Sequence, residues 1–295
     1  MDEPARAPEH GPRLSLSPSF TSLVALFAGP ALSVFVASQA IALFYPMPDP
    51  GPSGLSEEQL EQAFAKILAS PGGPFAFILP GQLTLLALAL LIAFFSQAPT
   101  AERLGMVRPR LSPLAFVLIL CGTLGLAGCL QALTPLLGEP SASLKQLNGL
   151  IASPTGGQAV LIALLVGVLA PVCEELFFRG LILRRLARNW TAFQAIGLTS
   201  AVFALTHVDP QHAIFVLPLG LWFGWLCWAT GSVWPAIAAH MLNNLAAMAL
   251  AQWMPEGHEP GFPEAAASLG LVALGALGVS LVRAGRTAGP VADPL

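Results

Sequence analysis

The sequence predicts an all-α protein, a polytopic membrane helix bundle of about eight transmembrane helices with both termini in the cytoplasm. The 295 residues are 55% hydrophobic and only 10% charged, whereas soluble domains carry about 25% charged residues. Apolar runs long enough to cross a bilayer recur along the chain. Basic residues gather in alternate connections between these runs, as the positive-inside rule describes.

Eight apolar runs are the candidate spans. The first is longer than the apolar core of a cleavable signal peptide, which has about 7–15 residues, so it predicts an uncleaved anchor. The runs are 20–45, 75–95, 114–137, 158–183, 193–206, 213–229, 233–253 and 267–282.

Two segments between the runs predict short helices that rest on the membrane surface. Ser56 and Gln59 have the spacing of a capping box at a helix start, and the apolar residues of 60–68 then fall on one face. A second amphipathic piece lies at 144–151. In the third run, the glycines of 122–128 recur at every third position, which favours close helix packing over a site.

The lysine and arginine residues outside the spans predict the orientation. Ten of them fall on one side of an eight-span count and two on the other. Because cytoplasmic loops carry the excess of basic residues, both termini are expected in the cytoplasm. The ten are Arg6, Arg13, Arg103, Arg108, Arg110, Arg184, Arg185, Arg188, Arg283 and Arg286, and the two are Lys66 and Lys145.

The predicted organisation has four segments and no separate soluble domain. Residues 1–19 are expected to form a disordered cytoplasmic tail, and residues 20–157 the N-terminal membrane spans with the surface amphipathic helices. Residues 158–253 form the predicted catalytic membrane core, and residues 254–295 the last span and a tail. No basic tract suggests nucleic acid as a partner, and all four cysteines lie in apolar segments, which argues against a disulfide framework.

Charged residues inside the fourth run are the first candidate functional residues. A charge at the centre of a bilayer costs about 2.5–3.5 kcal/mol on insertion scales, so charged residues in a span are usually functional. The fourth run contains three of them, Glu174, Glu175 and Arg179. On a helix, Glu175 and Arg179 are neighbours four residues apart in the favourable order. This pairing leaves Glu174 free for chemistry.

Two further runs contribute histidines. His207 closes the fifth run, and His240 shares one helix face with Asn244 in the seventh. At about 1.5 Å of rise per residue, Glu174 lies roughly 15 Å from its basic boundary, and the His240 pair roughly 10–16 Å from the same face. His207 comes out at roughly 24 Å. It therefore joins the others only if the fifth helix is tilted or starts deeper in the membrane. The nearby His212 is expected to be solvated at a span end.

This set of side chains suits two hydrolytic schemes. A carboxylate beside an imidazole can share the general-base role that activates water, while a second histidine and an asparagine amide donate hydrogen bonds to an oxyanion. Alternatively, two histidines and one glutamate supply the ligands of a catalytic zinc, whose bound water ionises near pH 7. The residue types alone do not choose between the schemes.

At these residues the chain resembles the CAAX-protease and bacteriocin-processing (CPBP, or Abi) family of intramembrane proteases. The family pattern is Glu-Glu-x-x-x-Arg, then Phe-x-x-x-His, then His-x-x-x-Asn, on successive membrane helices. All three motifs occur here in order, at 174–179, 203–207 and 240–244. The resemblance covers roughly residues 158–250.

The resemblance implies a role for each motif residue. Glu174 with His207 would activate water, His240 with Asn244 would stabilise the oxyanion, and Glu175 with Arg179 would support the site. Family members are described both as metalloproteases and as metal-independent glutamate proteases. A zinc ion would take Glu174, His207 and His240, but the metal-free scheme is favoured because Asn244 is a poor zinc ligand and a good oxyanion donor.

The expected function is therefore that of a CAAX endopeptidase-like intramembrane peptidase in a bacterial cell membrane. Its partners would be the lipid bilayer and a membrane-embedded or lipid-anchored protein or peptide, such as a prenylated tail, a peptide leader or a C-terminal sorting tail. Two other classes stay open: a non-catalytic membrane immunity or assembly factor, and a proton-coupled transporter that uses the same glutamates and histidines. A transporter predicts inverted repeats, and the sequence shows none.

Overall fold

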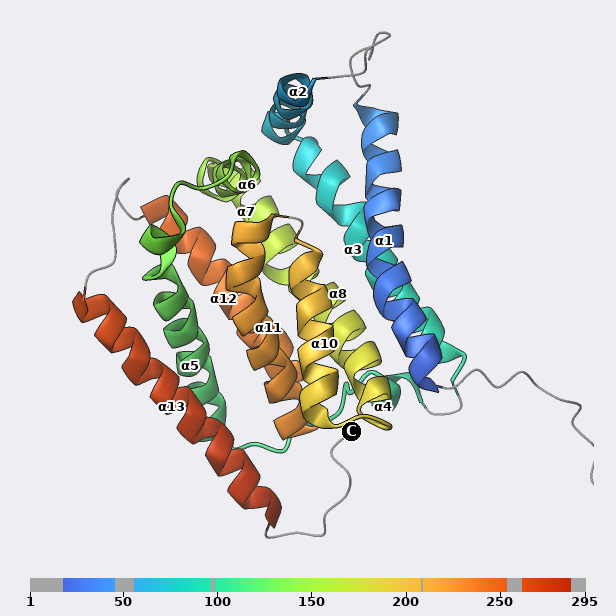
Figure 1. Ribbon diagram of the computed structural model, residues 1–295, viewed down its shortest axis with the longest axis vertical. Coiled ribbons are helices and arrows are strands. Elements are labelled where there is room, and N and C mark those ends of the chain that lie inside the picture. The colour runs from blue at the N-terminus through green and yellow to red at the C-terminus, as the bar shows by residue number, and fades with distance from the viewer. Residues whose placement is uncertain (1–17, 46–55, 97–98, 208, 254–261, 288–295) are drawn as a thin grey trace, which may run out of the picture.

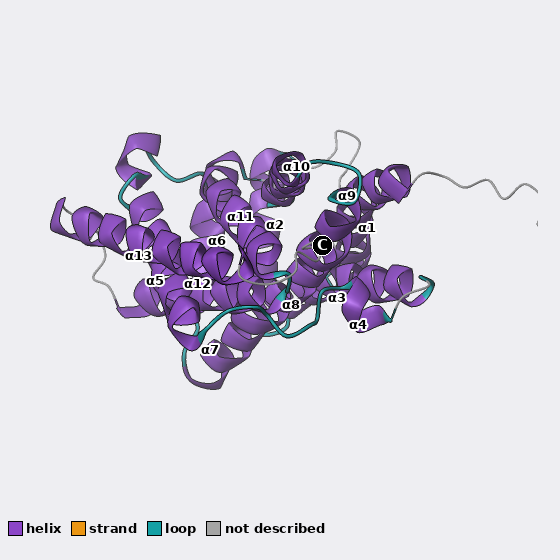
Figure 2. Cartoon of the chain, turned by 90° about the horizontal axis from the view of Figure 1, so that it is seen from below, coloured by secondary structure: helices purple, strands orange, loops and turns teal. Residues whose placement is uncertain are grey.

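The computed structural model describes residues 18–45, 56–96, 99–207, 209–253 and 262–287. Within these ranges every regular element is a helix and no strand occurs (Figure 2), so the all-α prediction is confirmed. The expected disordered tail at 1–19 lies almost entirely outside the described residues.

The described elements are all helical and follow one another along the chain. They are α1 (Pro18–Phe44), α2 (Glu57–Ala69), α3 (Gly73–Phe94), α4 (Thr100–Arg103), α5 (Pro113–Gln131), η1 (Thr134–Leu137), α6 (Ala142–Ala152), α7 (Gly156–Ile162), η2 (Ala163–Leu169), α8 (Ala170–Glu175), η3 (Leu176–Leu183), α9 (Arg184–Leu186), α10 (Ala192–Leu205), α11 (Pro210–Thr230), α12 (Trp234–Trp253) and α13 (Phe262–Thr287).

A helix lies over each of the eight predicted runs. Six helical stretches in the described residues are long and apolar enough to cross a membrane: α1, α3, α5, the continuous rod from α7 to α9, α11 and α13. The other two are α10, which has only 14 residues, and α12, which is long but does not reach the same hydropathy. The protein is thus a multi-pass membrane helix bundle, while the count of eight and the orientation of its termini stay predictions.

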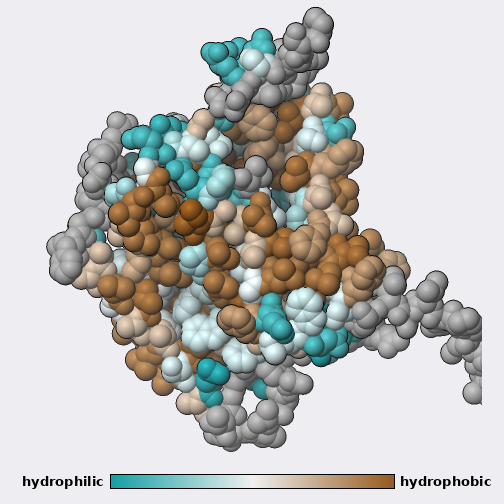
Figure 3. Space-filling view, in the orientation of Figure 1, coloured by the Kyte–Doolittle hydropathy of each residue, from teal (hydrophilic) through white to brown (hydrophobic). Residues whose placement is uncertain are grey.

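The helices form a central group with a helix pair on each side (Figure 1). α1 packs against α3 on one side, and α5 packs against α13 on the other. The rod, α10, α11 and α12 lie between these pairs and pack on one another. In the space-filling view, hydrophobic side chains cover a broad middle belt and hydrophilic ones gather towards its upper and lower edges (Figure 3).

Local sequence signals set the helix ends that position the central group. Thr191 and Gln194 form a capping box at the start of α10, and the Asp209 side chain caps the start of α11. Gly231 ends α11 with φ of 70°, a left-handed conformation that glycine adopts without strain. The capping box predicted at Ser56 is also present, at the start of α2.

The rod from α7 to α9 departs from regular α-helix on both sides of α8. η2 and η3 are π-helical, and α8 lies between them. Pro171, the second residue of α8, has no N–H for the helix ladder, so the change of winding directly before it avoids an interrupted α-helix. π-Helical turns are frequent at functional sites.

The glycine stripe on α5 packs closely on α13, as predicted. A Cβ atom at Gly122 would overlap the Cα of Gly275, and one at Gly125 would meet the backbone and Cβ of neighbouring α13 residues. Small residues let helix backbones approach in a membrane, where packing rather than hydrophobicity drives association.

We expect Gly275→Val to destabilise the protein by about 1–3 kcal/mol, the usual cost of overpacking a close contact. Gly270→Val is the matched control, because Gly270 lies on the same helix and a Cβ atom there would have no neighbouring atom within 4 Å. Equilibrium unfolding in mixed micelles, followed by circular dichroism, measures both variants. Equal stability of the two would contradict the packing role.

Candidate active site

The candidate side chains come from the central helices. Glu174 and Glu175 end α8, and Arg179 follows on η3. His240 lies on α12, and His207 lies in the turn between α10 and α11. Hydrogen bonds join Glu175 to Arg179 and His240, and Glu174 lies next to His240.

Glu175 is the centre of a buried network. Its Oε1 accepts a hydrogen bond from Arg179 Nη1 at 2.9 Å and contacts His240 Nδ1 at 3.0 Å. Arg179 Nη2 donates to the carbonyl of Gly220 at 2.9 Å. The side chains of Glu175 and Arg179 are both 0% exposed. Because isolated buried ions carry a large desolvation cost, these shared bonds hold the rod, α11 and α12 in one register.

Aromatic rings enclose the same network. The Arg179 guanidinium carbon lies 4.4 Å from the ring centroid of Phe203, within the range of a cation–π contact. The His240 ring stacks on Phe223 at 4.9 Å with an interplanar angle of 22°. Gly220 leaves little room here, because a Cβ atom would lie 3.2 Å from both Arg179 Nη2 and Phe203.

Glu174 is held from a helix outside the predicted set. Its Oε1 accepts a hydrogen bond of 2.7 Å from Gln82 Nε2 on α3, and its Oε2 lies 3.8 Å from His240 Nε2. Sequence reasoning missed Gln82. The available signal was one amide side chain in the middle of an apolar run, since polar groups at that depth need a partner.

The contacts of His240 define its proton positions. A carboxylate only accepts hydrogen bonds, so Nδ1 carries a proton that it donates to Glu175. Nε2 then faces Glu174. The distance of 3.8 Å is too long for a direct hydrogen bond, so a bridging oxygen can serve both groups.

His207 is close to this network without being bonded to it. Its Nδ1 lies 3.0 Å from the Phe203 carbonyl, which only accepts, so Nδ1 carries the proton. The Nε2 lone pair then remains as an acceptor, with no hydrogen bond to it among the described residues. The Phe203 ring contacts both His207, at a centroid distance of 5.1 Å, and His240, at 5.8 Å. Within the described residues, no hydrogen bond or ion pair joins His207 to Glu174 or His240.

Asn244 is oriented by two neighbours. Its Nδ2 donates to the carbonyl of Val166 on η2 at 3.0 Å, and its Oδ1 accepts from Asn243 Nδ2 at 3.1 Å. One of its two amide hydrogens is therefore used, and the other remains for a ligand. Asn243 had no predicted role, and its contact with Asn244 is a second feature that the sequence did not reveal.

The turn that carries His207 is tied to surface helix α6. Asp209 Oδ2 accepts hydrogen bonds from the hydroxyls of Ser141 and Ser143, the latter at 2.6 Å. Burial raises the pKa of Asp209, but these hydroxyls and nearby backbone N–H groups lower it by more, so the net pKa falls. His212, expected to be solvated, is half-buried. Its ring packs edge-on against that of His207, with 4.8 Å between the ring centroids.

The zinc scheme finds little support in this arrangement. Among the described residues, no three His, Cys, Asp or Glu side chains converge as metal ligands. The Phe203 ring contacts both His207 and His240. Glu175 pairs with Nδ1 of His240, which leaves only Nε2 of that ring as a nitrogen that could hold a metal. No catalytic step is therefore assigned to a metal.

Comparison with known proteins supports the predicted resemblance. Residues 156–246 match a family model described as "Type II CAAX prenyl endopeptidase Rce1-like", and this segment holds all three motifs. The match confirms the resemblance to the CAAX-protease and bacteriocin-processing family in this part of the chain.

One relative is a Bacillus subtilis (strain 168) protein named "Putative membrane peptidase YdiL". It is 27% identical over 121 residues, which cover 41% of this chain and 47% of the relative. The similarity thus spans about half the length of that protein. No solved structure matches the chain.

We expect Arg179→Met to destabilise the fold by about 3–5 kcal/mol, because it leaves the buried Glu175 carboxylate without its cationic partner. Arg108→Met, at an exposed position, is the control and should change stability little. Unfolding in mixed micelles measures both. Similar stabilities would show that the Arg179–Glu175 pair does not hold the helices together.

Proposed function

We propose that the protein is an intramembrane endopeptidase that hydrolyses a peptide bond in a membrane-associated protein or peptide. The observation that carries the proposal is the pair formed by Glu174 and His240. These two groups face each other across 3.8 Å. A hydrogen bond orients each of them, from Gln82 to Glu174 and from His240 to Glu175. Such positioning is what general acid–base catalysis requires.

In this proposal, Glu174 takes a proton from a bound water. The water oxygen attacks the carbonyl carbon of the scissile bond, a C–O bond forms, and the carbonyl electron pair moves onto oxygen. Collapse of this intermediate breaks the C–N bond, and the proton held by Glu174 passes to the leaving nitrogen. His207, whose Nε2 lone pair is free, is the proposed second acceptor for the water.

The oxyanion would be stabilised by His240 and the free amide hydrogen of Asn244. Because His240 Nδ1 donates to Glu175, Nε2 can donate only when the ring is protonated. Glu175 supplies the negative charge that such a ring needs. Its proposed role therefore extends beyond the structural support that the family resemblance implies.

The proposed substrates are membrane-embedded or lipid-anchored chains. The matching family model describes a CAAX prenyl endopeptidase, which makes a prenylated C-terminal tail one class, beside peptide leaders and C-terminal sorting tails. The Bacillus relative supports a bacterial cell membrane as the location.

The function is tested in the source organism by comparing peptides of the membrane fraction from three strains. These carry the wild-type protein, a deletion, or Glu174→Gln. We expect at least one membrane peptide to be uncut in both the deletion and the Glu174→Gln strain, because loss of a general base lowers the rate by about 10²–10⁴-fold.

Two results would contradict the peptidase proposal. One is a Glu174→Gln strain in which every cleavage lost on deletion is restored. The other is a deletion that changes no peptide, which would favour the non-catalytic or transporter alternatives. A proton flux into liposomes that depends on Glu174 would then identify the transporter.

For Gln82→Met we expect kcat to fall about 10–100-fold, because a hydrogen bond to a charged group contributes about 1.5–3 kcal/mol. KM should stay close to that of the wild type, since Gln82 acts by orienting Glu174. The cleavage rate of the peptide identified above, measured with protein in liposomes, gives both constants. Leu83→Met, at the adjacent exposed position, is the control, and an unchanged kcat in Gln82→Met would exclude the positioning role.

A further inference from the structure

Four arginines gather at the end of the bundle that carries α4 and α9. This basic cluster consists of Arg103 on α4, Arg184 and Arg185 on α9, and Arg188 just after α9. The first three are half-buried and Arg188 is exposed. Arg188 lies within electrostatic range of the other three, so the cluster is one concentrated patch of positive charge.

Neutral oxygen atoms, not carboxylates, orient two members of the cluster. Arg103 Nε donates to the Ser96 hydroxyl at 3.0 Å. Arg185 donates from Nε to the Ser22 hydroxyl at 3.1 Å and from Nη2 to the Thr21 hydroxyl at 3.0 Å. These bonds fix the direction of each guanidinium but leave its charge in place.

The loop after α4 is built around a third member. Arg184 Nη1 donates to the carbonyl of Gly231 at 3.2 Å, and Nη2 to the carbonyl of Glu102 at 3.4 Å. A Cβ atom at Gly105 would lie 3.0 Å from Arg184 Nη1, and Gly105 also has φ of 66°. Only glycine suits both constraints, so the loop and Arg184 are fitted to each other.

The charge of the basic cluster is not balanced within the described part of the chain. No carboxylate there lies within ion-pair distance of any of the four guanidiniums. Burial, followed by the neighbouring guanidiniums of Arg103, Arg184 and Arg185, lowers the pKa of Arg188. Nη1 and Nη2 of Arg103 and Nη1 of Arg185 make no hydrogen bond in the described structure. Guanidinium N–H groups that are not used within the protein are suited to bind phosphate oxygens.

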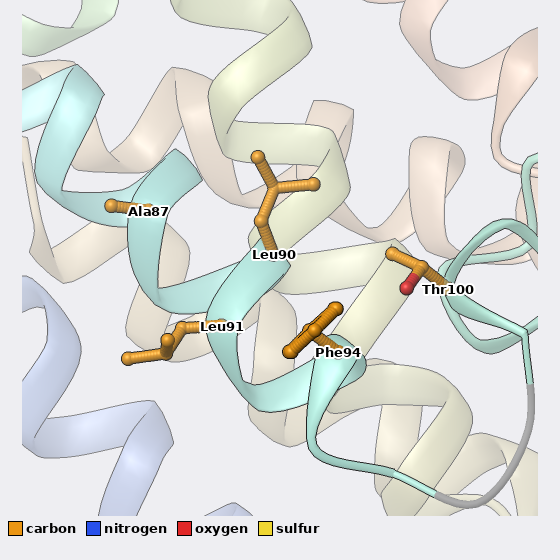
Figure 4. Close-up of a pocket in the computed structure, with 5 residues that line it drawn as sticks. All are labelled: Ala87, Leu90, Leu91, Phe94 and Thr100. Carbon is orange, nitrogen blue, oxygen red and sulfur yellow. The ribbon is translucent and has the colours of Figure 1, made fainter.

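An apolar hollow of about 350 Å³ lies beside the cluster. Four residues of α3 line it, Ala87, Leu90, Leu91 and Phe94, together with Thr100 at the start of α4 (Figure 4). Thr100 and Arg103 share the single turn of α4. One lining residue of the hollow thus lies on the same short helix as Arg103, and the others lie on a membrane-spanning helix, with Leu90, Leu91 and Phe94 exposed.

We propose that this end of the bundle binds one anionic phospholipid, with its phosphate on Arg103, Arg185 and Arg188 and an acyl chain in the hollow along α3. The unbalanced charge selects an anionic headgroup. The apolar hollow selects a ligand with a hydrocarbon chain over a soluble phosphate. A bound lipid of this kind would join α1, α3, α4 and α9 at one end of the bundle.

The test uses the purified full-length protein in detergent micelles, with native mass spectrometry after addition of equal amounts of phosphatidylglycerol and phosphatidylcholine. We expect the wild type to retain phosphatidylglycerol in preference. The double variant Arg103→Gln, Arg188→Gln should lose about 25-fold in affinity, because each arginine near an anionic headgroup contributes a factor of about five.

Three controls separate this proposal from general surface charge and from misfolding. Arg108→Gln with Arg110→Gln removes two exposed arginines of the same connection and should retain the lipid. Arg103→Lys with Arg188→Lys keeps the charge and should recover most of the affinity. Leu90→Trp fills the hollow and should weaken retention with the arginines intact.

Three outcomes would overturn the proposal. They are equal retention of the two lipids by the wild type, equal loss in the two glutamine double variants, and displacement of phosphatidylglycerol by inorganic phosphate with no effect of Leu90→Trp. The last outcome would identify a site for soluble phosphate.

Discussion

The Glu175 carboxylate is the interaction on which the central helices depend. A charge placed among apolar helices has no water to solvate it, so every hydrogen bond that it can make has to come from the protein. Glu175 meets this demand with Arg179 from its own rod and His240 from α12, while Arg179 continues to the backbone of α11. The register of three helices is thereby coupled to one buried anion, and moving any of them would expose an unpaired charge.

This coupling also explains how the site can be ordered while lying on an irregular helix. The π-helical stretches on both sides of α8 change the direction in which side chains leave the rod. Glu174 and Glu175 both lie on the regular helix α8 between these stretches, where adjacent side chains point about 100° apart. They therefore reach different partners, Gln82 on α3 for one and the Arg179–His240 network for the other. The division between one carboxylate for support and one that is free for chemistry rests on this difference in partners.

Local spacing was sufficient to predict the contacts within single helices. The pairing of Glu175 with Arg179 follows from four-residue spacing, and the capping box at Ser56 follows from side-chain type. The contacts of Gln82 could not be predicted in this way, because they depend on which faces of α3 and the rod meet. Depth counting at a constant rise likewise assumed straight α-helices, which the rod is not.

The position of His207 also could not be predicted from residue spacing alone. A count of residues placed it deeper than His240, and in the structure the Phe203 ring contacts both imidazoles. The phenylalanine of the Phe-x-x-x-His motif therefore does more than mark the helix. Its carbonyl sets the tautomer of His207, and its ring packs on the Arg179 guanidinium.

Charge balance distinguishes the centre of the bundle from its basic end. At the centre, Glu175 pairs with Arg179 and His240, and Glu174 faces His240. Each ion there thus has an ionisable partner within the protein, as buried charges require. The arginines of the basic cluster have no ion-pair partner among the described residues. Desolvation of a charge favours an oppositely charged partner. Glu175 has such a partner within the protein, whereas the proposed partner of the basic cluster is an anionic lipid.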